Sequence, residues 1–250
     1  MTQAALGCTV GVARIPGGFL FFKNRDLLRE HREHRILVFE STPESYSLRG
    51  INLKTRELEG VSIGVNRHRV CVASTHVQSS NDMSYDLLCE RLLHGVRQPE
   101  DVHPVLDRFL RQGPVQGGRI LVALPRTAFL IEVFQDESRI EQIESSFAMT
   151  NSFSLIDYRP ERPEILDRSS DNRLDVATRW IAKIEHVGDL KSMLRSHVPQ
   201  KGPVSICTHD PGEIGTESSH IVEVHGSLVT WSSLAGAPCE NDYNAVQLFR

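Results

Sequence analysis

Cys8 is the side chain whose position in this sequence most favours chemistry. It follows Gly7 and opens an apolar segment typical of a strand. Cleavage between Gly7 and Cys8 would place a free α-amino group beside the thiol. Because an α-amino group has a pKa of about 8, it can accept the thiol proton at neutral pH, so one residue would supply both nucleophile and base. The alternative is a buried strand cysteine with a structural role.

Arg25 and Asp26 are the next residues that could take part in such chemistry. They end a second apolar segment, and a turn at residues 15–18 predicts that the two segments pair as a hairpin. The end of the second strand would then lie beside Cys8. An arginine there would favour the thiolate, and an aspartate would orient the α-ammonium group or receive its proton. A salt bridge at an exposed turn is the alternative.

Two cysteine–histidine pairs offer a rival mechanism. Cys207 and His209 alternate along a predicted strand and would share one of its faces, and Cys71 and His76 lie close together in the sequence. Buried structural cysteines are the alternative interpretation. The five cysteines are scattered and include no CxxC pair, which disfavours a disulfide framework and a structural zinc site. We therefore predict no metal site and no organic cofactor.

The elements that must position these residues are mainly strands, with helices in two later blocks. Apolar and β-branched runs predict the strands, and apolar residues at helical spacing predict the helices. The predicted strands are Cys8–Arg14, Phe19–Lys23, Arg35–Glu40, Val61–Val65, Val70–Ser74, Ile120–Leu124, Ala128–Phe134, Arg139–Glu144, Val204–Cys207, His220–Val224 and Leu228–Ser232. The predicted helices are Tyr85–Leu93, Val102–Arg111, Arg173–Glu185 (opened by Ser169 or Ser170) and Asp189–His197. This order predicts one α+β domain with mainly antiparallel sheets.

The segment GCTVGVARIPGGFLFFKNRD (residues 7–26) resembles the start of N-terminal-nucleophile hydrolases that use a cysteine. It is most similar to the acyl-coenzyme A:6-aminopenicillanic acid and isopenicillin N acyltransferase family, which is related to the choloylglycine hydrolases. Further short motifs in family order are Gly64-Val65-Asn66, Thr150-Asn151-Ser152-Phe153, Ser169-Ser170-Asp171-Asn172-Arg173, Ile206-Cys207-Thr208-His209, Thr216 with Ser218-Ser219, and Gly236-Ala237-Pro238-Cys239 with Tyr243. Each motif is short, and their shared order is the specific feature.

This resemblance implies a fold, a maturation step and roles for residues. The fold would be a four-layer αββα sandwich, and self-cleavage before Cys8 would remove residues 1–7 as a short propeptide, leaving residues 8–250 as a single catalytic domain. Cys8 would be the nucleophile, and Arg25 and Asp26 would match the cluster that holds the nucleophile and its amine. Asn151 would line the amine and oxyanion region. Arg173 would match an arginine at a helix start that faces the thiolate.

The region that would stabilise an oxyanion departs from the family pattern. Related proteins often carry an asparagine after the strand that ends here at Ser74, where this chain has Thr75 and His76. The Thr75 hydroxyl or a backbone N–H group could donate instead. Asn66 matches the family's Gly-x-Asn segment and completes the predicted oxyanion and substrate region.

The composition excludes several classes of partner. The chain has 250 residues, with 28 Lys+Arg against 32 Asp+Glu, and its net charge of −4 gives no reason to expect nucleic acid or an anionic membrane surface. Its apolar runs are shorter than the roughly 18 residues that span a bilayer. The first residues lack the basic stretch and long apolar core of a secretory signal, so we expect a cytoplasmic protein. The sequence is compatible with a homo-oligomer.

These observations predict an amidohydrolase that cleaves a carbon–nitrogen amide bond of a small molecule or small peptide-like substrate through an acyl-thioester on Cys8. One alternative is an acyltransferase that moves an acyl group from a coenzyme A or carrier-protein thioester to an amine. A second alternative is a non-catalytic member of the fold that keeps residues 1–7.

Overall fold

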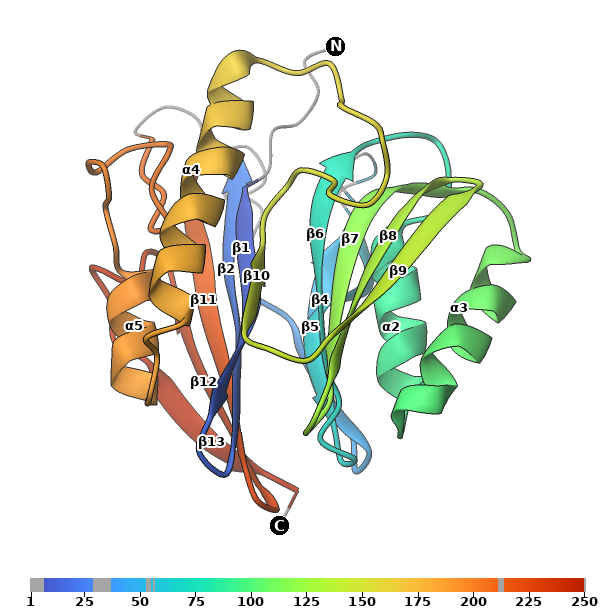
Figure 1. Cartoon of the computed structure of the whole chain (residues 1–250), viewed down its shortest axis with the longest axis horizontal. Helices are drawn as coiled ribbons and strands as arrows, with labels where there is room; N and C mark the ends of the chain where they lie inside the picture. The colour runs from blue at the N-terminus through green and yellow to red at the C-terminus, as the bar shows by residue number, and fades with distance from the viewer. Residues whose placement is uncertain (1–6, 29–36, 53–54, 56, 211–213, 250) are drawn as a thin grey trace.

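The computed structural model describes residues 7–28, 37–52, 55, 57–210 and 214–249. In this part of the chain two sheets pack face to face, and helices cover the outer face of each sheet (Figure 1). Neighbouring strands within each sheet are antiparallel. The predicted α+β, four-layer αββα architecture is therefore confirmed.

The strands of the first sheet are β1 (Cys8–Ile15), β2 (Gly18–Leu28), β10 (Phe147–Met149), β11 (Ile214–His225), β12 (Leu228–Ala235) and β13 (Asn244–Leu248). They lie in the order β10-β1-β2-β11-β12-β13. The strands of the second sheet are β3 (Phe39–Ser41), β4 (Ser45–Ile51), β5 (Leu58–Asn66), β6 (Cys71–Gln78), β7 (Val115–Ala123), β8 (Ala128–Gln135) and β9 (Glu137–Ile143). They follow one another in chain order across the sheet.

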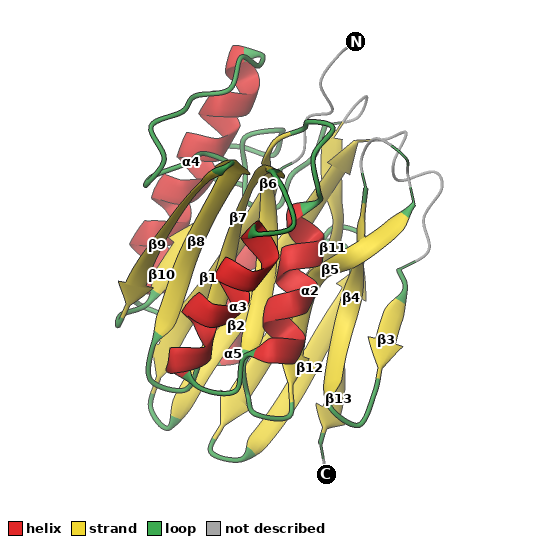
Figure 2. Cartoon of the chain, turned by 90° about the vertical axis from the view of Figure 1, so that its right-hand side faces the viewer, coloured by secondary structure: helices red, strands yellow, loops and turns green. Residues whose placement is uncertain are grey.

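Helices form the two outer layers. Those outside the first sheet are α4 (Glu164–Ile181) and α5 (Val187–Leu194), and those outside the second sheet are α2 (Tyr85–Gly95) and α3 (Val102–Leu110), with a short 3₁₀ turn at Pro99–Asp101 before α3. Figure 2 shows α2 and α3 lying across the strands of the second sheet. Each described helix is too short or too polar to cross a membrane.

Three apolar cores hold the layers together: one between the sheets and one under each pair of helices. The β2 strand contributes to two of them because alternate side chains point to opposite faces. Phe21 faces the second sheet, whereas Leu20 and Phe22 face α4 and α5. A strand covered on both faces is expected to be apolar almost throughout, which explains the run FLFFK.

The predicted hairpin of β1 and β2 is confirmed, and its register pairs Cys8 with Arg25. Gly17 in the turn has a φ of +79°, which favours glycine. A Cβ atom on Gly18 would lie 1.8 Å from the carbonyl oxygen of Val224 in β11, so a side chain is excluded there. The sequence of the turn therefore fixes how the start of β1 meets the end of β2.

The predicted strand over residues 204–207 is wrong, because this segment forms turns. The Ser205 hydroxyl lies within hydrogen-bond distance of the carbonyl oxygens of Gly202 and Cys207, at 2.9 and 2.6 Å. Such local contacts compete with pairing between strands. The segment stays outside both sheets as a consequence.

The start of the long helix also differs from the prediction. The α4 helix begins at Glu164, directly after Pro163, and not at Ser169 or Ser170, and it ends at Ile181. Pro163 is the N-cap residue, and because the residue before a proline disfavours helical conformation, α4 does not extend further back. The acidic residues Glu164 and Asp167 of the first turn complement the helix dipole. Arg173 consequently lies near the middle of α4, not at its start.

Strands at or near the sheet edges were not predicted. These are β4, β10 and β13, and β10 has only three residues. The predicted strand at residues 35–40 lies partly outside the described residues, and β3 begins at Phe39. Short or exposed strands carry little apolar patterning, so their pairing depends on neighbours that are distant in the sequence.

Candidate active site

Cys8 lies at the first position of β1, between the two sheets, and only 5% of its surface is exposed. It lines a cavity of about 20 Å³, which has room for roughly one water molecule. The other residues that line this cavity are Lys23, Arg25, Leu27, Ile51, Ser62, Ser74, His76, Tyr85 and Asp86. The thiol therefore faces a small polar space while its chain continues back to Gly7.

The peptide bond between Gly7 and Cys8 is held on both sides. The backbone N–H of Asp26 donates to the Gly7 carbonyl oxygen at 2.8 Å, and the backbone N–H of Cys8 donates to Asn151 Oδ1 at 2.8 Å. The Cys8 carbonyl oxygen accepts a hydrogen bond from Arg173 Nη1. Three fixed groups thus set the orientation of this bond relative to the Cys8 side chain.

The Asn151 side chain is oriented by its own contacts. Its Oδ1 atom also accepts a hydrogen bond from Arg173 Nη2 at 3.0 Å, and its Nδ2 atom donates to the His76 carbonyl oxygen at 2.8 Å. The Asn151 backbone N–H donates to the Ser170 hydroxyl at 3.1 Å. The amide oxygen of Asn151 is therefore directed at the nitrogen that cleavage would turn into an α-amine.

Asp26 is fully buried on the opposite face of β2 from Arg25. The hydroxyls of Thr208 and Thr216 donate to its two oxygens at 3.0 and 2.7 Å, and Arg173 Nη1 lies 4.0 Å away. Burial raises the pKa of Asp26 to about 6, and Arg173 and the two hydroxyls oppose that rise. The carboxyl group can therefore exchange a proton close to neutral pH.

Arg25 and Lys23 are the cations on the same face of the hairpin as Cys8. Arg25 lies 3.5 Å from Glu217, and Lys23 Nζ donates to the Ser62 hydroxyl at 2.7 Å. Burial raises the pKa of the Cys8 thiol above its usual value, and Lys23 is the largest influence in the other direction. In the uncleaved chain the thiol therefore stays protonated near neutral pH.

Lys23 is a site residue that the sequence analysis missed. Its signal was present, because the alternation of Phe19, Phe21 and Lys23 puts a lysine at an inward-facing position of an apolar strand. A buried amine at such a position needs partners, and here its three hydrogens meet the Ser62 hydroxyl and the carbonyls of Ser62 and Ser74.

The predicted oxyanion and substrate residues fall into two places. His76 lines the same cavity as Cys8, whereas the Thr75 hydroxyl donates to the carbonyl of Thr150, the residue before Asn151, at 3.0 Å. Burial lowers the pKa of His76 to about 3, so its ring is neutral. Asn66 lies instead at the turn between β5 and β6, where its side chain donates to two carbonyls at the end of α2.

Of the two rival cysteine–histidine pairs, one is separated and the other meets away from the cavity at Cys8. Cys71 is buried at the start of β6, whereas His76 lies towards the other end of that strand. Cys207 Sγ and His209 Nε2 do meet, at 3.3 Å, although the strand on which their predicted proximity rested does not form. They lie in the turns after residue 202, and they do not line the cavity at Cys8.

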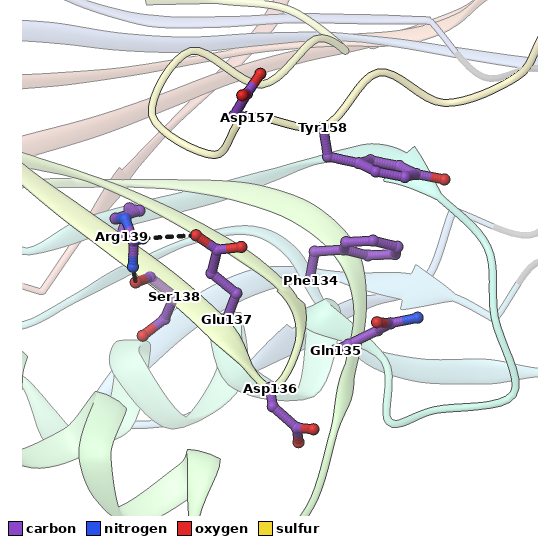
Figure 3. A pocket seen from close by; sticks show the side chains of 8 residues that line it. All are labelled: Phe134, Gln135, Asp136, Glu137, Ser138, Arg139, Asp157 and Tyr158. Atoms are coloured by element: carbon purple, nitrogen blue, oxygen red, sulfur yellow. Dashed lines mark hydrogen bonds and ion pairs between the residues drawn. The ribbon is translucent and has the colours of Figure 1, made fainter.

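A larger hollow of about 670 Å³ lies at the turn between β8 and β9 (Figure 3). Its residues are Phe134, Gln135, Asp136, Glu137, Ser138, Arg139, Asp157 and Tyr158. The rings of Phe134 and Tyr158 stack there with centroids 4.3 Å apart. The hollow shares no residue with the cavity at Cys8, so we do not include it in the candidate active site.

Comparison with known proteins shows what this architecture resembles. No protein-family model and no curated protein sequence matches the chain. Penicillin V acylase from Agrobacterium tumefaciens is similar in structure, with 11% identity, a TM-score of 0.57, and coverage of 98% of this chain and 86% of that one. A variant of conjugated bile acid hydrolase from Clostridium perfringens has 11% identity, a TM-score of 0.53, and coverage of 96% and 92%. The chain thus has the N-terminal-nucleophile hydrolase fold, as its sequence resemblance implies.

Proposed function

We propose that this chain is an amidohydrolase whose nucleophile is Cys8, released by self-cleavage of the bond between Gly7 and Cys8. The observation that carries the proposal is the pair of hydrogen bonds on that bond, from Asp26 N–H to the Gly7 carbonyl and from Cys8 N–H to Asn151 Oδ1. The fold shared with an acylase and a hydrolase supports it. The substrate class is a small molecule with an amide-linked acyl group.

Self-cleavage would use the contacts that already exist. The Cys8 sulfur attacks the Gly7 carbonyl carbon, and the Asp26 N–H group stabilises the resulting oxyanion. The thiol proton passes to the Cys8 nitrogen as the C–N bond breaks, which leaves a thioester between Gly7 and Cys8. Water then hydrolyses the thioester to a Gly7 carboxylic acid, and Cys8 regains its thiol together with a free α-amine.

Turnover would reuse the same groups. The α-amine, held by Asn151 Oδ1, accepts the thiol proton, and the sulfur attacks the amide carbonyl of the substrate. The amine then protonates the leaving nitrogen, and water resolves the acyl-enzyme. Arg173 keeps Asn151 and the Cys8 carbonyl in place. Arg25, which lines the cavity at Cys8, would favour the thiolate, and the Asp26 carboxylate beside Arg173 would balance the charge of that arginine.

Oxyanion stabilisation in turnover is assigned to Asn151 and a backbone N–H group. The Thr75 hydroxyl donates its only hydrogen to the Thr150 carbonyl, so it would first have to release that carbonyl. A well-placed donor of this kind lowers the barrier by about 3 kcal/mol. The His76 ring, which is neutral and faces the cavity, would border the bound acyl group.

The intact mass of the freshly purified chain tests the proposal. We expect the wild type and a Cys89→Ala control to lose residues 1–7 and to hydrolyse members of a panel of small N-acyl amides. Cys8→Ala should keep the full mass and show no hydrolysis. An active enzyme with residues 1–7 attached, or activity retained by Cys8→Ala, would overturn the proposal. Added hydroxylamine tests the acyltransferase alternative, because a transferase would give acyl hydroxamate in preference to acid.

A further inference from the structure

Four metal-ligating side chains meet outside the first sheet, away from the cavity at Cys8. They are His197 after α5, Cys207 and His209 in the turns that follow residue 202, and Cys239 between β12 and β13. One donor atom from each of the four lies within 4.8 Å of the donor atoms of the other three. Two imidazoles and two thiols are thus gathered from three separate segments of the chain.

The spacing of these atoms fits tetrahedral zinc. Zinc bonds of about 2.3 Å to sulfur and about 2.0 Å to nitrogen place the ligand atoms about 3.3–3.8 Å apart. His209 Nε2 lies 3.3 Å from Cys207 Sγ and 3.1 Å from Cys239 Sγ. The rings of His197 and His209 have centroids 5.1 Å apart and meet edge to face. Small movements of the side chains would complete the tetrahedron.

Hydrogen bonds within the cluster do not give every one of its polar side-chain atoms a partner. A neutral imidazole nitrogen has one lone pair, so His209 Nε2 can accept a hydrogen from only one of the two thiols that it contacts. His197 Nε2 is buried and has no hydrogen-bond partner among the described residues. Buried polar atoms without partners are rare, and a bound ion is one of the recognised reasons for them. A cation at the centre would satisfy all four side chains.

Groups around the cluster hold its members in place. Glu240 Oε1 lies 3.9 Å from His209 Nδ1 and is itself bonded to Lys201 at 2.9 Å. A carboxylate on that side favours a proton on Nδ1 and leaves Nε2 free for a metal, as is usual for histidine ligands. The backbone N–H of Cys207 donates to the Ser196 carbonyl at 3.1 Å, which ties the segments that carry two of the ligands.

We propose that His197, Cys207, His209 and Cys239 bind one Zn²⁺ ion in a closed structural site. Two soft thiolates and two imidazoles in tetrahedral arrangement suit zinc, and four protein ligands leave no open position for catalysis. The lack of a CxxC pair, which disfavoured zinc in the sequence, does not bear on ligands gathered by the fold. The proposal is independent of the amidohydrolase function.

The site would also brace the candidate active site. Thr208 lies between two of the ligands in the chain, and its hydroxyl donates to Asp26 at 3.0 Å. Thr216 shares in this contact, since its hydroxyl accepts from the Thr208 N–H at 2.9 Å and donates to Asp26. Because two ligands of the zinc ion flank Thr208, the ion would fix the segment that orients the Asp26 carboxyl group.

Metal analysis of the full-length chain tests the proposal. After incubation with zinc and gel filtration, the wild type should retain about one zinc ion per chain. Cys207→Ser and Cys239→Ser should weaken zinc binding by roughly a hundredfold or more, since even outer partners change metal affinity by about 10- to 100-fold. Glu240→Gln tests that outer role and should weaken binding about tenfold. Cys89→Ala, a buried cysteine elsewhere, should bind as the wild type does.

A measurement on the wild type guards against variants that fail to fold. Chelated wild-type chain titrated with Co²⁺ should develop the visible bands of tetrahedral cobalt with thiolate ligands. A wild type that leaves the column free of zinc, or zinc that remains on the double variant Cys207→Ser/Cys239→Ser, would overturn the proposal. A disulfide between Cys207 and Cys239 in the freshly purified, non-reduced chain would overturn it as well.

Discussion

At the scale of single residues, the contacts around Cys8 require a very small residue before it. A Cβ atom on Gly7 would lie 2.7 Å from Asp26 Oδ2 and 3.3 Å from Arg173 Nη2. The distance to Asp26 Oδ2 is shorter than real Cβ contacts, and the distance to Arg173 Nη2 is tight. Because both side chains are buried, neither can easily move away from an added Cβ atom. The Gly7 carbonyl could then keep its bond to the Asp26 N–H only if Asp26 or Arg173 moved.

Gly7→Ala should therefore slow self-cleavage. We expect a rate at least about tenfold below that of the wild type, because a misplacement of reacting groups by about 1 Å can lower a rate by about a hundredfold. The rate is measured from intact masses over time after purification. Gly202→Ala is the matched control, since a Cβ atom there would meet nothing within 4 Å. Cleavage of Gly7→Ala at the wild-type rate would contradict the prediction.

The sequence allowed some of these residues to be placed and not others. The proximity of Arg25 to Cys8 follows from turn length and strand alternation, which are local properties, and the structure confirms it. Asn151 and Arg173 were joined to Cys8 only through the family resemblance, because contacts across more than a hundred residues leave no local pattern. The cluster of His197 and Cys239 was missed for the same reason.

At the scale of elements, α4 is fastened to the start of β1 by one side chain. Arg173 is fully buried near the middle of the helix and donates to the Cys8 carbonyl, to Asn151 Oδ1 and to the Thr9 hydroxyl. Its charge also faces Asp26 at 4.0 Å. A charged partner lost from such a position leaves the other charge buried without compensation.

Arg173→Met should consequently destabilise the chain. We expect the free energy of unfolding at neutral pH to fall by about 3–5 kcal/mol, measured by urea unfolding. Arg179→Met on the same helix is the control, because Arg179 pairs with Asp175 at the surface and such a pair contributes about 0–1 kcal/mol. Equal losses in the two variants would show that the buried contacts of Arg173 add nothing.

Asp86, in the first turn of α2, should make the stability of the chain depend on pH. Asp86 is buried, its pKa is raised to about 6 chiefly by burial, and it accepts a hydrogen bond from the Ser74 hydroxyl. Between about pH 4 and pH 6 the unfolded chain releases this proton while the folded chain retains it. The contribution of Asp86 to the free energy of unfolding therefore decreases as the pH rises from about 4 to about 6, and it is lowest above about pH 6.

The comparison of wild type with Asp86→Asn isolates this effect. The free energy of unfolding of the wild type, minus that of the variant, should decrease as pH rises from about 4 to about 6 and then level off. Urea unfolding at a series of pH values measures it. Other titrating groups are common to both chains and largely cancel in the difference. A difference that rises with pH, or that stays constant, would contradict the raised pKa.

The elements themselves were predicted where the apolar pattern was strong. The central strands and the α2 and α3 helices follow from alternation and helical spacing; the two helices appear close to their predicted bounds, whereas β2 and β11 extend several residues beyond theirs. The wrong strand at residues 204–207 has apolar residues but forms turns around the Ser205 hydroxyl. An apolar run shows that a segment is buried, and it leaves open whether that segment pairs with a sheet.

At the scale of the whole molecule, stability depends on the core between the two sheets. Trp231 on β12 is fully buried in this core and packs against Phe39 and Tyr46 of the other sheet, with ring centroids 6.2 and 5.1 Å apart. The side chain therefore joins the two sheets directly. The second tryptophan, Trp180, lies half-buried on α4 at the edge of a different core.

The two tryptophans allow a matched comparison. Trp231→Ala should lower the free energy of unfolding by about 3–5 kcal/mol, as for other large aromatic side chains removed from a packed core. Trp180→Ala should lower it by clearly less, since part of that ring stays in water. Urea unfolding followed by far-ultraviolet circular dichroism measures both. Similar losses would mean that the interface between the sheets is no more tightly packed than the outer layer.

The position of Cys8 has a consequence for any chain end produced there. The ends of most polypeptides fray, but Cys8 is paired with Arg25 of β2 on one side and is bound by Asn151 and Arg173 on the other. A terminus made at this point would keep these hydrogen bonds and be held more firmly than an ordinary chain end. We therefore expect the new α-amine to resist removal by aminopeptidases, which act on unfolded chain ends.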